Sequence, residues 1–334
     1  MPTMPSLRSL LLIPLLFWAP VKAVPHPEPC RGACNGRDPG FIRRADGRYF
    51  RFQSYNGISI SSAPSMEGPW SAPRSMLPQG SSINLPGRRD LWLLTHMQAP
   101  DVYKVHDEYH VYYSVSTLGS RNSAIGLATS RTMEPGSWTD HGSVGVQTSE
   151  RDNYNAIDGN LFEDADGSLR FNFGSYWGGL FQVGMNNDGT RTAPLSSAVN
   201  LAYEPGWNHH IEAAFLYRHH NDYYLFFSWG KAGDYDISPP APGEEYRIKV
   251  CRSPMPSGPF VGSDGRPCTE GGGMTVLASH DNIFGPGGQG IMTTPEYGPV
   301  LYYHYTNTDI GWSNAEQLIG WNRLDFSSGW PVVV

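Results

Sequence analysis

Long apolar runs are missing from this sequence of 334 residues, apart from one close to its start. Charged residues are scarce, at 16%, and they form no basic stripe, so nucleic acid is not an expected partner. The sequence also has no heptad repeat, no long amphipathic helical pattern, no low-complexity linker and no Asn-X-Ser/Thr triplet for N-glycosylation. These absences exclude a coiled coil, a protein with several membrane-spanning helices and a string of linked modules.

The apolar run close to the start has the features of a secretory signal peptide. Arg8 precedes the apolar residues Leu10 to Trp18, and Val21-Lys22-Ala23 supplies small residues at a cleavage site. The run is too short to span a bilayer comfortably. We therefore expect residues 1–23 to be removed, and residues 24–334 to form a secreted, extracellular monomer that has no membrane partner.

Cysteine is rare, with four residues in the whole chain. An even number in a secreted protein predicts disulfide bonds, and four cysteines allow three pairings. We favour Cys30–Cys34 and Cys251–Cys268 because both pairs are local, with free thiols as the alternative. A zinc site is disfavoured because the spacings differ from those of zinc ribbons.

Aromatic residues, glycine and proline are abundant, and a pattern of strands repeats five times. Aromatics make up 13% of the residues, beside 38 glycines and 28 prolines, which suits many short strands joined by tight turns. The five copies open at residues 38, 99, 158, 212 and 289, at steps of 61, 59, 54 and 77, and each closes in an aromatic strand.

A repeat of this length with several strands in each copy predicts an all-β fold, a five-bladed β-propeller. We expect one propeller domain over residues 24–334. We also expect the two termini to meet in a shared blade, because residues 37–55 and the C-terminal residues both have strand character.

Three of the five copies open with a carboxylate, namely Asp38, Asp158 and Glu212. Equivalent positions of a propeller converge on the axis, so these side chains are expected to share one cavity. If each carboxylate is judged singly, a role as a strand-end cap is the simpler explanation. Three carboxylates at equivalent positions instead favour the chemistry of glycoside hydrolysis, which uses one protonated and one ionised carboxyl group. The apolar neighbours of Glu212, such as Ile211 and Phe215, are expected to raise its pKa by desolvation, which suits the acid.

Several motifs resemble those of family 43 glycoside hydrolases, and most closely those of the fungal endo-1,5-α-L-arabinanases in that family. The motifs are Arg37-Asp38-Pro39, Gln98-Ala99-Pro100-Asp101-Val102, Asn155-Ala156-Ile157-Asp158-Gly159, His210-Ile211-Glu212-Ala213, Gly285-Pro286-Gly287-Gly288-Gln289-Gly290 and Gly320-Trp321-Asn322-Arg323-Leu324-Asp325-Phe326. The resemblance implies a five-bladed propeller that hydrolyses internal bonds of linear arabinan, a side chain of pectin, with inversion. It implies that Asp38 is the general base, that Glu212 is the general acid, and that Asp158 tunes and orients the acid. No cofactor is required for this chemistry.

The sequence departs from the family pattern at two places. Arg37 stands where members often have histidine, and Gly288 and Gln289 stand where many bacterial relatives have a histidine that helps to hold a metal. His304 is the remaining axial candidate, so we name His304 and Gln289 as candidate ligands of a structural Ca²⁺ ion near the axis. A hydrogen-bonded core histidine is the alternative for His304.

Exposed tryptophans are the expected platforms for sugar rings. Trp92, Trp177 and Trp229 are the candidates, with packing in a blade as the alternative for each. Two other functions stay open at this point. An exo-acting arabinofuranosidase or xylosidase of the same family would release terminal sugars, and a non-catalytic sugar-binding propeller would not need a buried unpaired acid. A sucrose- or fructan-cleaving relative also uses Arg-Asp-Pro, but further along the chain.

Overall fold

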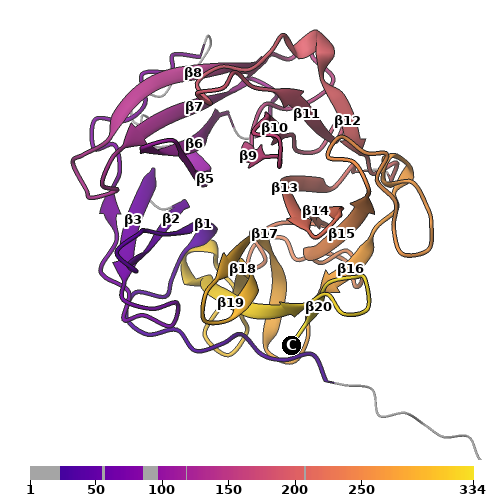
Figure 1. Ribbon diagram of the computed structural model, residues 1–334. Coiled ribbons are helices and arrows are strands. Elements are labelled where there is room, and N and C mark those ends of the chain that lie inside the picture. The colour runs from indigo at the N-terminus through magenta and orange to yellow at the C-terminus, as the bar shows by residue number, and fades with distance from the viewer. Residues whose placement is uncertain (1–22, 55–56, 86–96, 118, 207) are drawn as a thin grey trace, which may run out of the picture.

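A computed structural model describes residues 23–54, 57–85, 97–117, 119–206 and 208–334, and the expected signal peptide therefore lies almost wholly outside the described residues. Five four-stranded antiparallel sheets follow one another along the chain and surround a common axis, as Figure 1 shows. The predicted five-bladed propeller is confirmed. No helix in the described part of the chain is long and apolar enough to cross a membrane.

Each blade is built from four consecutive strands, with the first strand innermost. The strands are β1 (Arg37–Arg43), β2 (Tyr49–Ser54), β3 (Ile58–Ala63) and β4 (Arg74–Ser75) in blade 1; β5 (Met97–Val105), β6 (Glu108–Ser116), β7 (Ser123–Ser130) and β8 (Thr139–Thr148) in blade 2; β9 (Asn160–Glu163), β10 (Leu169–Phe173), β11 (Leu180–Gly184) and β12 (Val199–Ala202) in blade 3; β13 (Ile211–His219), β14 (Asp222–Trp229), β15 (Arg247–Ser253) and β16 (Met274–Leu277) in blade 4; and β17 (Ile283–Thr294), β18 (Gly298–Asn307), β19 (Leu318–Asp325) and β20 (Val332–Val333) in blade 5.

The hydrophobic core consists of five clusters, and each cluster lies between two neighbouring blades. Between blades 4 and 5, for example, Phe226 and Ile248 pack against Leu301 and Tyr303. The other four clusters join blades 1 and 2, 2 and 3, 3 and 4, and 5 and 1. The aromatic side chains of the second strands are thus buried between neighbouring sheets, where they hold the blades together.

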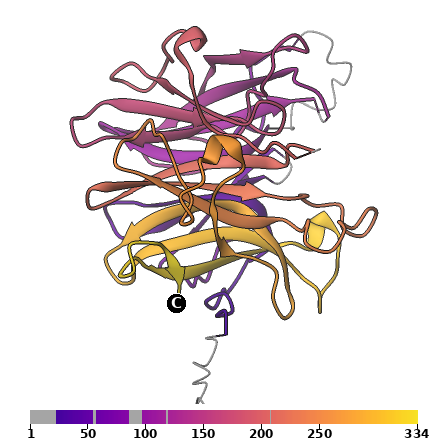
Figure 2. The same cartoon turned by 90° about the vertical axis from the view of Figure 1, so that its right-hand side faces the viewer.

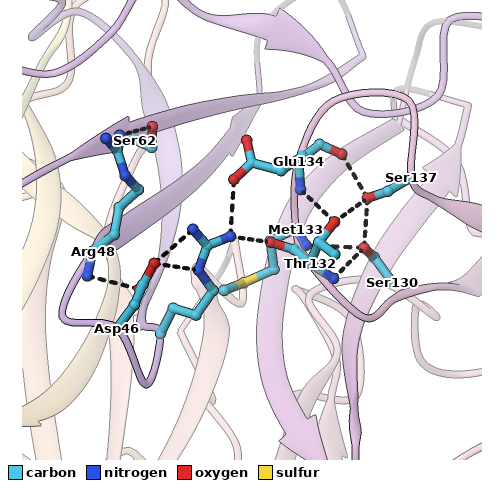
Figure 3. A network of polar contacts seen from close by, with 9 residues as sticks. Asp46, Arg48, Ser62, Ser130, Thr132, Met133, Glu134 and Ser137 are labelled. Carbon is cyan, nitrogen blue, oxygen red and sulfur yellow. Dashed lines mark hydrogen bonds and ion pairs between the residues drawn. The ribbon is translucent and has the colours of Figure 1, made fainter.

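Polar contacts add to this packing between the β1–β2 turn of blade 1 and the β7–β8 turn of blade 2. The Arg44 guanidinium donates hydrogen bonds to Asp46 within its own turn, and to Glu134 and the Thr132 carbonyl across the gap. Figure 3 shows the surrounding network, in which Ser130 and Ser137 hold the facing turn. The hydrogen bonds from the Arg44 guanidinium and the Arg48 amide lower the pKa of Asp46 to about 2. The contacts are exposed, so their contribution is in the small range of surface ion pairs.

The ring closes where both termini meet β19. The amide of Glu28 donates to the Trp321 carbonyl and the amide of Gly36 to the Gln317 carbonyl, while β20 pairs with Leu324 and Asp325. Figures 1 and 2 show the segment before β1 running beside the C-terminus. The expectation of a shared blade holds, but the N-terminal partner is the segment before residue 37 rather than residues 37–55. Those residues form the inner strands of blade 1.

The two predicted disulfides, Cys30–Cys34 and Cys251–Cys268, are both present. The first lies in the N-terminal segment that runs along β19. The second joins β15 to the loop before β16 and is buried in the cluster between blades 3 and 4. Both therefore hold segments that the sheets alone contact only at an edge.

Candidate active site

Five residues with a left-handed backbone mark equivalent positions on the innermost strands. They are Asp38, Ala99, Asp158, Ala213 and Gly288, with φ values of 46, 48, 58, 55 and 58°. In four blades the strand register shifts there, as a β-bulge requires. A bulge bends the strand and turns its side chain, which suits an active site.

This alignment corrects two of the five positions expected from the sequence. The equivalent residue is Ala213 in blade 4 and Gly288 in blade 5, each one residue away from the expected opener. Glu212 therefore precedes the bulge residue of its blade, opposite Ser228 of β14. Asp38 and Asp158 do occupy equivalent positions, so the acid side chain approaches the axis from a different backbone position.

Asp38 is held through both its side chain and its backbone. Ser54, at the end of β2, donates its hydroxyl to Oδ2 at 2.8 Å, and the Asp38 amide donates to Nδ1 of His304 at 3.1 Å. A quarter of the side chain remains exposed, at 25%. A carboxylate that is fixed on one oxygen and partly exposed has the arrangement expected of a general base.

Asp158 is anchored to the backbone beside the proposed acid. Its Oδ2 accepts the amide hydrogen of Ala213 at 3.0 Å, while its own amide donates to Ser114 Oγ at 2.9 Å. Burial, followed by the negative charges of Glu212 and Asp38, raises its pKa well above the ordinary value. These charge effects place the three carboxyl groups in one electrostatic unit, although they are far apart in sequence.

Glu212 receives a hydrogen bond on each carboxyl oxygen. Ser175 donates to Oε2 and Tyr246 to Oε1, both at 2.8 Å. Burial raises the pKa of Glu212, the two hydroxyl donors oppose that shift, and the charge of Asp38 adds to it, with a raised pKa as the net result. The carboxyl group is thereby oriented and kept protonated to a higher pH than an exposed glutamate.

His304 is buried next to Asp38. Its Nδ1 lies 3.4 Å from Asp38 Oδ1, which would form an ion pair if the imidazole were protonated. Burial lowers the pKa of His304 to about 4, more strongly than the charge of Asp38 raises it, so the ring is neutral near neutral pH. In that form Nδ1 accepts the Asp38 amide hydrogen, and the ring hydrogen lies on Nε2.

Gln289 is fully engaged by protein partners. Its Oε1 accepts the Ser228 hydroxyl at 2.7 Å, and its Nε2 donates to the Ala213 carbonyl at 2.8 Å. The amide joins blades 4 and 5 behind the bulge of blade 4.

The three candidate tryptophans differ in position. Trp92 lies outside the described residues. Trp177 is half-buried in a turn with left-handed backbone at Tyr176 and Trp177, directly after Ser175, and Arg121 lies over its ring. Strain of this kind is concentrated at functional sites, and this turn also supplies the Ser175 contact to Glu212.

Trp229 is half-buried, as Trp177 is. Its indole donates to Glu204, and the charged ends of Arg247 and Lys249 lie over its ring. A sugar ring would have to displace these cations in order to stack on Trp229, as it would have to displace Arg121 from Trp177.

The sequence reasoning missed the residues that hold the carboxylates: Ser54, Ser175 and Tyr246. A signal for Ser54 was present, because three of the second strands carry a serine at or near their end, after their aromatic residues, at Ser54, Ser114 and Ser228. Ser175 lies in the glycine-rich turn that was noted only for its tryptophan. Tyr246 lies just before β15 and gives no local signal.

A five-bladed propeller that gathers three carboxyl groups at its axis, one of them raised in pKa and oriented by two hydroxyls, has the fold and the site of a glycoside hydrolase. The chain belongs to the glycosyl hydrolases family 43, whose family model matches residues 33–331.

Known proteins of similar sequence and structure agree with this class. The chain is 55% identical over 331 residues to a probable arabinan endo-1,5-alpha-L-arabinosidase A from Aspergillus terreus, covering 95% of this chain and 97% of the relative. Its structure resembles an exo-1,5-alpha-L-arabinanase from a bovine ruminal metagenomic library, with a TM-score of 0.77, 29% identity and coverage of 90% and 97%. It also resembles an endo-arabinanase from Bacillus licheniformis, with a TM-score of 0.76, 28% identity and coverage of 91% and 99%.

Proposed function

We propose that this protein hydrolyses internal α-1,5-L-arabinofuranosidic bonds of linear arabinan with inversion of configuration. The observation that carries the proposal is the contrast between the two carboxyl groups. Glu212 is buried, doubly hydrogen-bonded and raised in pKa, whereas Asp38 accepts the Ser54 hydroxyl on Oδ2 and keeps a quarter of its side chain exposed. An acid and a base in different environments are what glycoside hydrolysis requires.

In the proposed reaction, Asp38 accepts a proton from a water molecule as its oxygen attacks the anomeric carbon. Glu212 donates its proton to the departing sugar oxygen as the carbon–oxygen bond breaks. The products are two shorter sugar chains, with Asp38 protonated and Glu212 ionised until they exchange protons with solvent. An inverting pair leaves room for the water, with carboxyl groups roughly 6.5–9.5 Å apart.

We assign Asp158 a role in supporting the general acid Glu212 rather than in contacting the sugar. Its carboxylate holds the Ala213 amide, so it fixes the backbone that carries Glu212. The charge of Glu212 in turn raises the pKa of Asp158, so the two carboxyl groups belong to one electrostatic unit. The contact with the Ala213 amide supports an oriented acid.

Cleavage within the chain, rather than at its end, is supported by the endo-acting name of the fungal relative. The exo-arabinanase among the similar structures has the same fold, so the fold alone does not decide the mode of action. Trp177, beside the Ser175 contact to Glu212, is the proposed stacking residue.

Hydrolases of this family need no cofactor for the chemistry. We infer that Gln289 and His304 do not hold a structural calcium ion at the axis, because the two side chains fit one poorly. Calcium prefers six to eight oxygen ligands. Gln289 is already hydrogen-bonded at both ends, and the buried Nε2 of His304, which has no partner among the described residues, carries the ring hydrogen. The described residues contain no group of three or more His, Cys, Asp or Glu side chains suited to a metal.

We further propose that the protein is secreted as a monomer after cleavage following Ala23. Two disulfides in the described structure support an oxidising compartment. N-terminal sequencing and light scattering of protein from the culture medium test this, with Val24 expected as the first residue.

The test of the function follows viscosity and reducing ends together on linear arabinan. An early fall in viscosity while few reducing ends have appeared is the expected result, because internal cuts shorten long chains quickly. Release of single arabinose units without that fall would support the exo-acting alternative. Binding of arabinan without any new reducing ends would support a sugar-binding propeller.

The variants D38N and E212Q assign the roles. Each is expected to lower kcat by at least about 10²–10⁴-fold while circular dichroism stays that of the wild type. Near-native activity in either variant would contradict the role given to that residue.

A further inference from the structure

Five hydrogen bonds between neighbouring blades form a closed ring around the propeller axis. In each bond, the amide of one of the five left-handed residues donates to a side chain of the preceding blade. The bonds run from Ala99 to Ser54 Oγ (2.9 Å), from Asp158 to Ser114 Oγ (2.9 Å), from Ala213 to Asp158 Oδ2 (3.0 Å), from Gly288 to Ser228 Oγ (2.9 Å) and from Asp38 to His304 Nδ1 (3.1 Å).

The acceptors occupy the same place in four of the blades. Ser54, Ser114, Ser228 and His304 each stand on the second strand, opposite the residue before the bulge. Blade 3 has Gly174 in this place, and there the carboxylate of Asp158 supplies the missing acceptor. His304 is therefore the exception to a serine pattern, and it stands at the joint between the last blade and the first.

The glycines of blade 5 make room for this histidine. A Cβ atom on Gly288 would lie 2.6 Å from His304 Nδ1 and 2.9 Å from Asp38 Oδ1. A Cβ atom on Gly287 would lie 2.0 Å from Cε1 of Tyr246. Ala99 and Ala213 adopt the same left-handed backbone, so contact with the imidazole, rather than backbone strain, requires glycine at 288.

His304 also contacts the side chain that orients the acid. Its ring lies parallel to that of Tyr246, with centroids 6.0 Å apart and an interplanar angle of 24°. Tyr246 in turn donates to Glu212 Oε1. A serine at this position would accept the Asp38 amide hydrogen but would not reach the Tyr246 ring.

We propose that His304 is a positioning residue that fixes the general base and the general acid relative to each other, through the Asp38 amide on one side and the Tyr246 ring on the other. This inference rests on the roles proposed for Asp38 and Glu212. His304 touches neither water nor sugar in this role. It closes the ring between blades 5 and 1 as a neutral hydrogen-bond acceptor, and it does so without a metal.

The direct test is the pair H304A and H304N, assayed on linear arabinan at a temperature where both are folded. A misplacement of about 1 Å at a catalytic group costs about 10²-fold in rate. H304A is therefore expected to lower kcat about ten- to hundredfold with KM within about threefold. In H304N the amide oxygen stands close to the position of Nδ1, so this variant should recover part of the loss.

A matched control separates positioning from general destabilisation. Tyr303 is the neighbour of His304 on β18, and its hydroxyl donates to Asn322 Oδ1 within the core between blades 4 and 5. Y303F loses one buried hydrogen bond, so it should lower the melting temperature and leave kcat unchanged.

Three results would overturn the proposal: H304A with near-native kcat, Y303F with a loss of kcat equal to that of H304A, or wild-type activity that falls in EDTA and returns with Ca²⁺. The third would mean that the site acts through a metal. D38N separates a failure of the positioning role from a failure of the proposed function. An inactive D38N beside an active H304A would refute only the positioning role of His304. An active D38N would refute the role of Asp38 as the general base.

Discussion

Replacement of Tyr246 by phenylalanine should move the alkaline limit of activity to higher pH. Activity requires Glu212 to be protonated, so kcat/KM falls as pH rises through its pKa. The Tyr246 hydroxyl donates to Oε1 at 2.8 Å and stabilises the ionised carboxylate, which lowers that pKa. Y246F removes this stabilisation, the pKa of Glu212 rises further, and the protonated acid persists to higher pH.

The size of the effect follows from the kind of bond that is lost. A hydrogen bond to a charged group contributes about 1.5–3 kcal/mol, and 1.4 kcal/mol corresponds to a factor of ten. Ser175 still donates to Oε2, so the lower end applies. The ratio of Y246F to wild-type kcat/KM should therefore increase about tenfold between the acidic plateau and the alkaline side of the profile.

The assay is a full pH profile of kcat/KM on linear arabinan for wild type, Y246F and Y224F. Y224F is the matched control, since Tyr224 donates its hydroxyl to the Gly329 carbonyl in the core between blades 4 and 5. Its profile should keep the wild-type shape. An alkaline limit of Y246F at or below that of the wild type would refute the reasoning, because the hydroxyl would then not stabilise the ionised acid.

Three further predictions concern residues around the site and the disulfides. D158N should lower kcat but keep the stability of the wild type, because the amide oxygen of asparagine can still accept the Ala213 amide hydrogen. D158A should lower kcat and also lower the free energy of unfolding by about 1–3 kcal/mol, measured with denaturant. Equal stability of the two variants would contradict the anchoring role of Asp158. G288A should lower both stability and kcat, and a double-mutant cycle should show a smaller cost in the H304A background; additive effects would mean that the imidazole does not require the glycine. Replacement of Cys251 and Cys268 by alanine should cost about 3 kcal/mol in the free energy of unfolding for a separation of 17 residues, against about 2 kcal/mol for Cys30 and Cys34 with a separation of 4; the reverse order would contradict the loop-length argument.

The sequence was sufficient for the number of blades and the two disulfides, because each leaves a local pattern. It also predicted that Asp38, Asp158 and Glu212 share one cavity, and in the structure the charges of Glu212 and Asp38 raise the pKa of Asp158. Repeated strands with turn residues predict blades, and cysteines close in sequence predict local pairs. The sequence did not show that Glu212 stands one residue before the position in blade 4 that is equivalent to Asp38 and Asp158. A bulge in β13 places Ala213 at the position that Asp38 and Asp158 occupy in their blades, and a shift of one residue cannot be read from the spacing of the copies.

The supporting side chains were the harder part, since they act across blades. Tyr246 comes from blade 4, and it has space only because position 287 in blade 5 is glycine. The motif Gly285-Pro286-Gly287-Gly288-Gln289-Gly290 was recognised by resemblance, yet its physical reason appears only in three dimensions: Cβ atoms on its glycines would strike Tyr235, Tyr246, His304 and Tyr302. The cations over the candidate platform Trp229 could not be predicted for a similar reason, because they come from the neighbouring strand β15.

The most direct test of the central claim is the anomeric configuration of the first product. Proton NMR during cleavage of linear arabino-oligosaccharides at high enzyme concentration observes the new reducing end before it mutarotates. A base-activated water opposite the leaving oxygen predicts the β-anomer first, with the α-anomer appearing later at the rate of mutarotation. Appearance of the α-anomer first would mean a covalent intermediate and would contradict the roles given to Asp38 and Glu212.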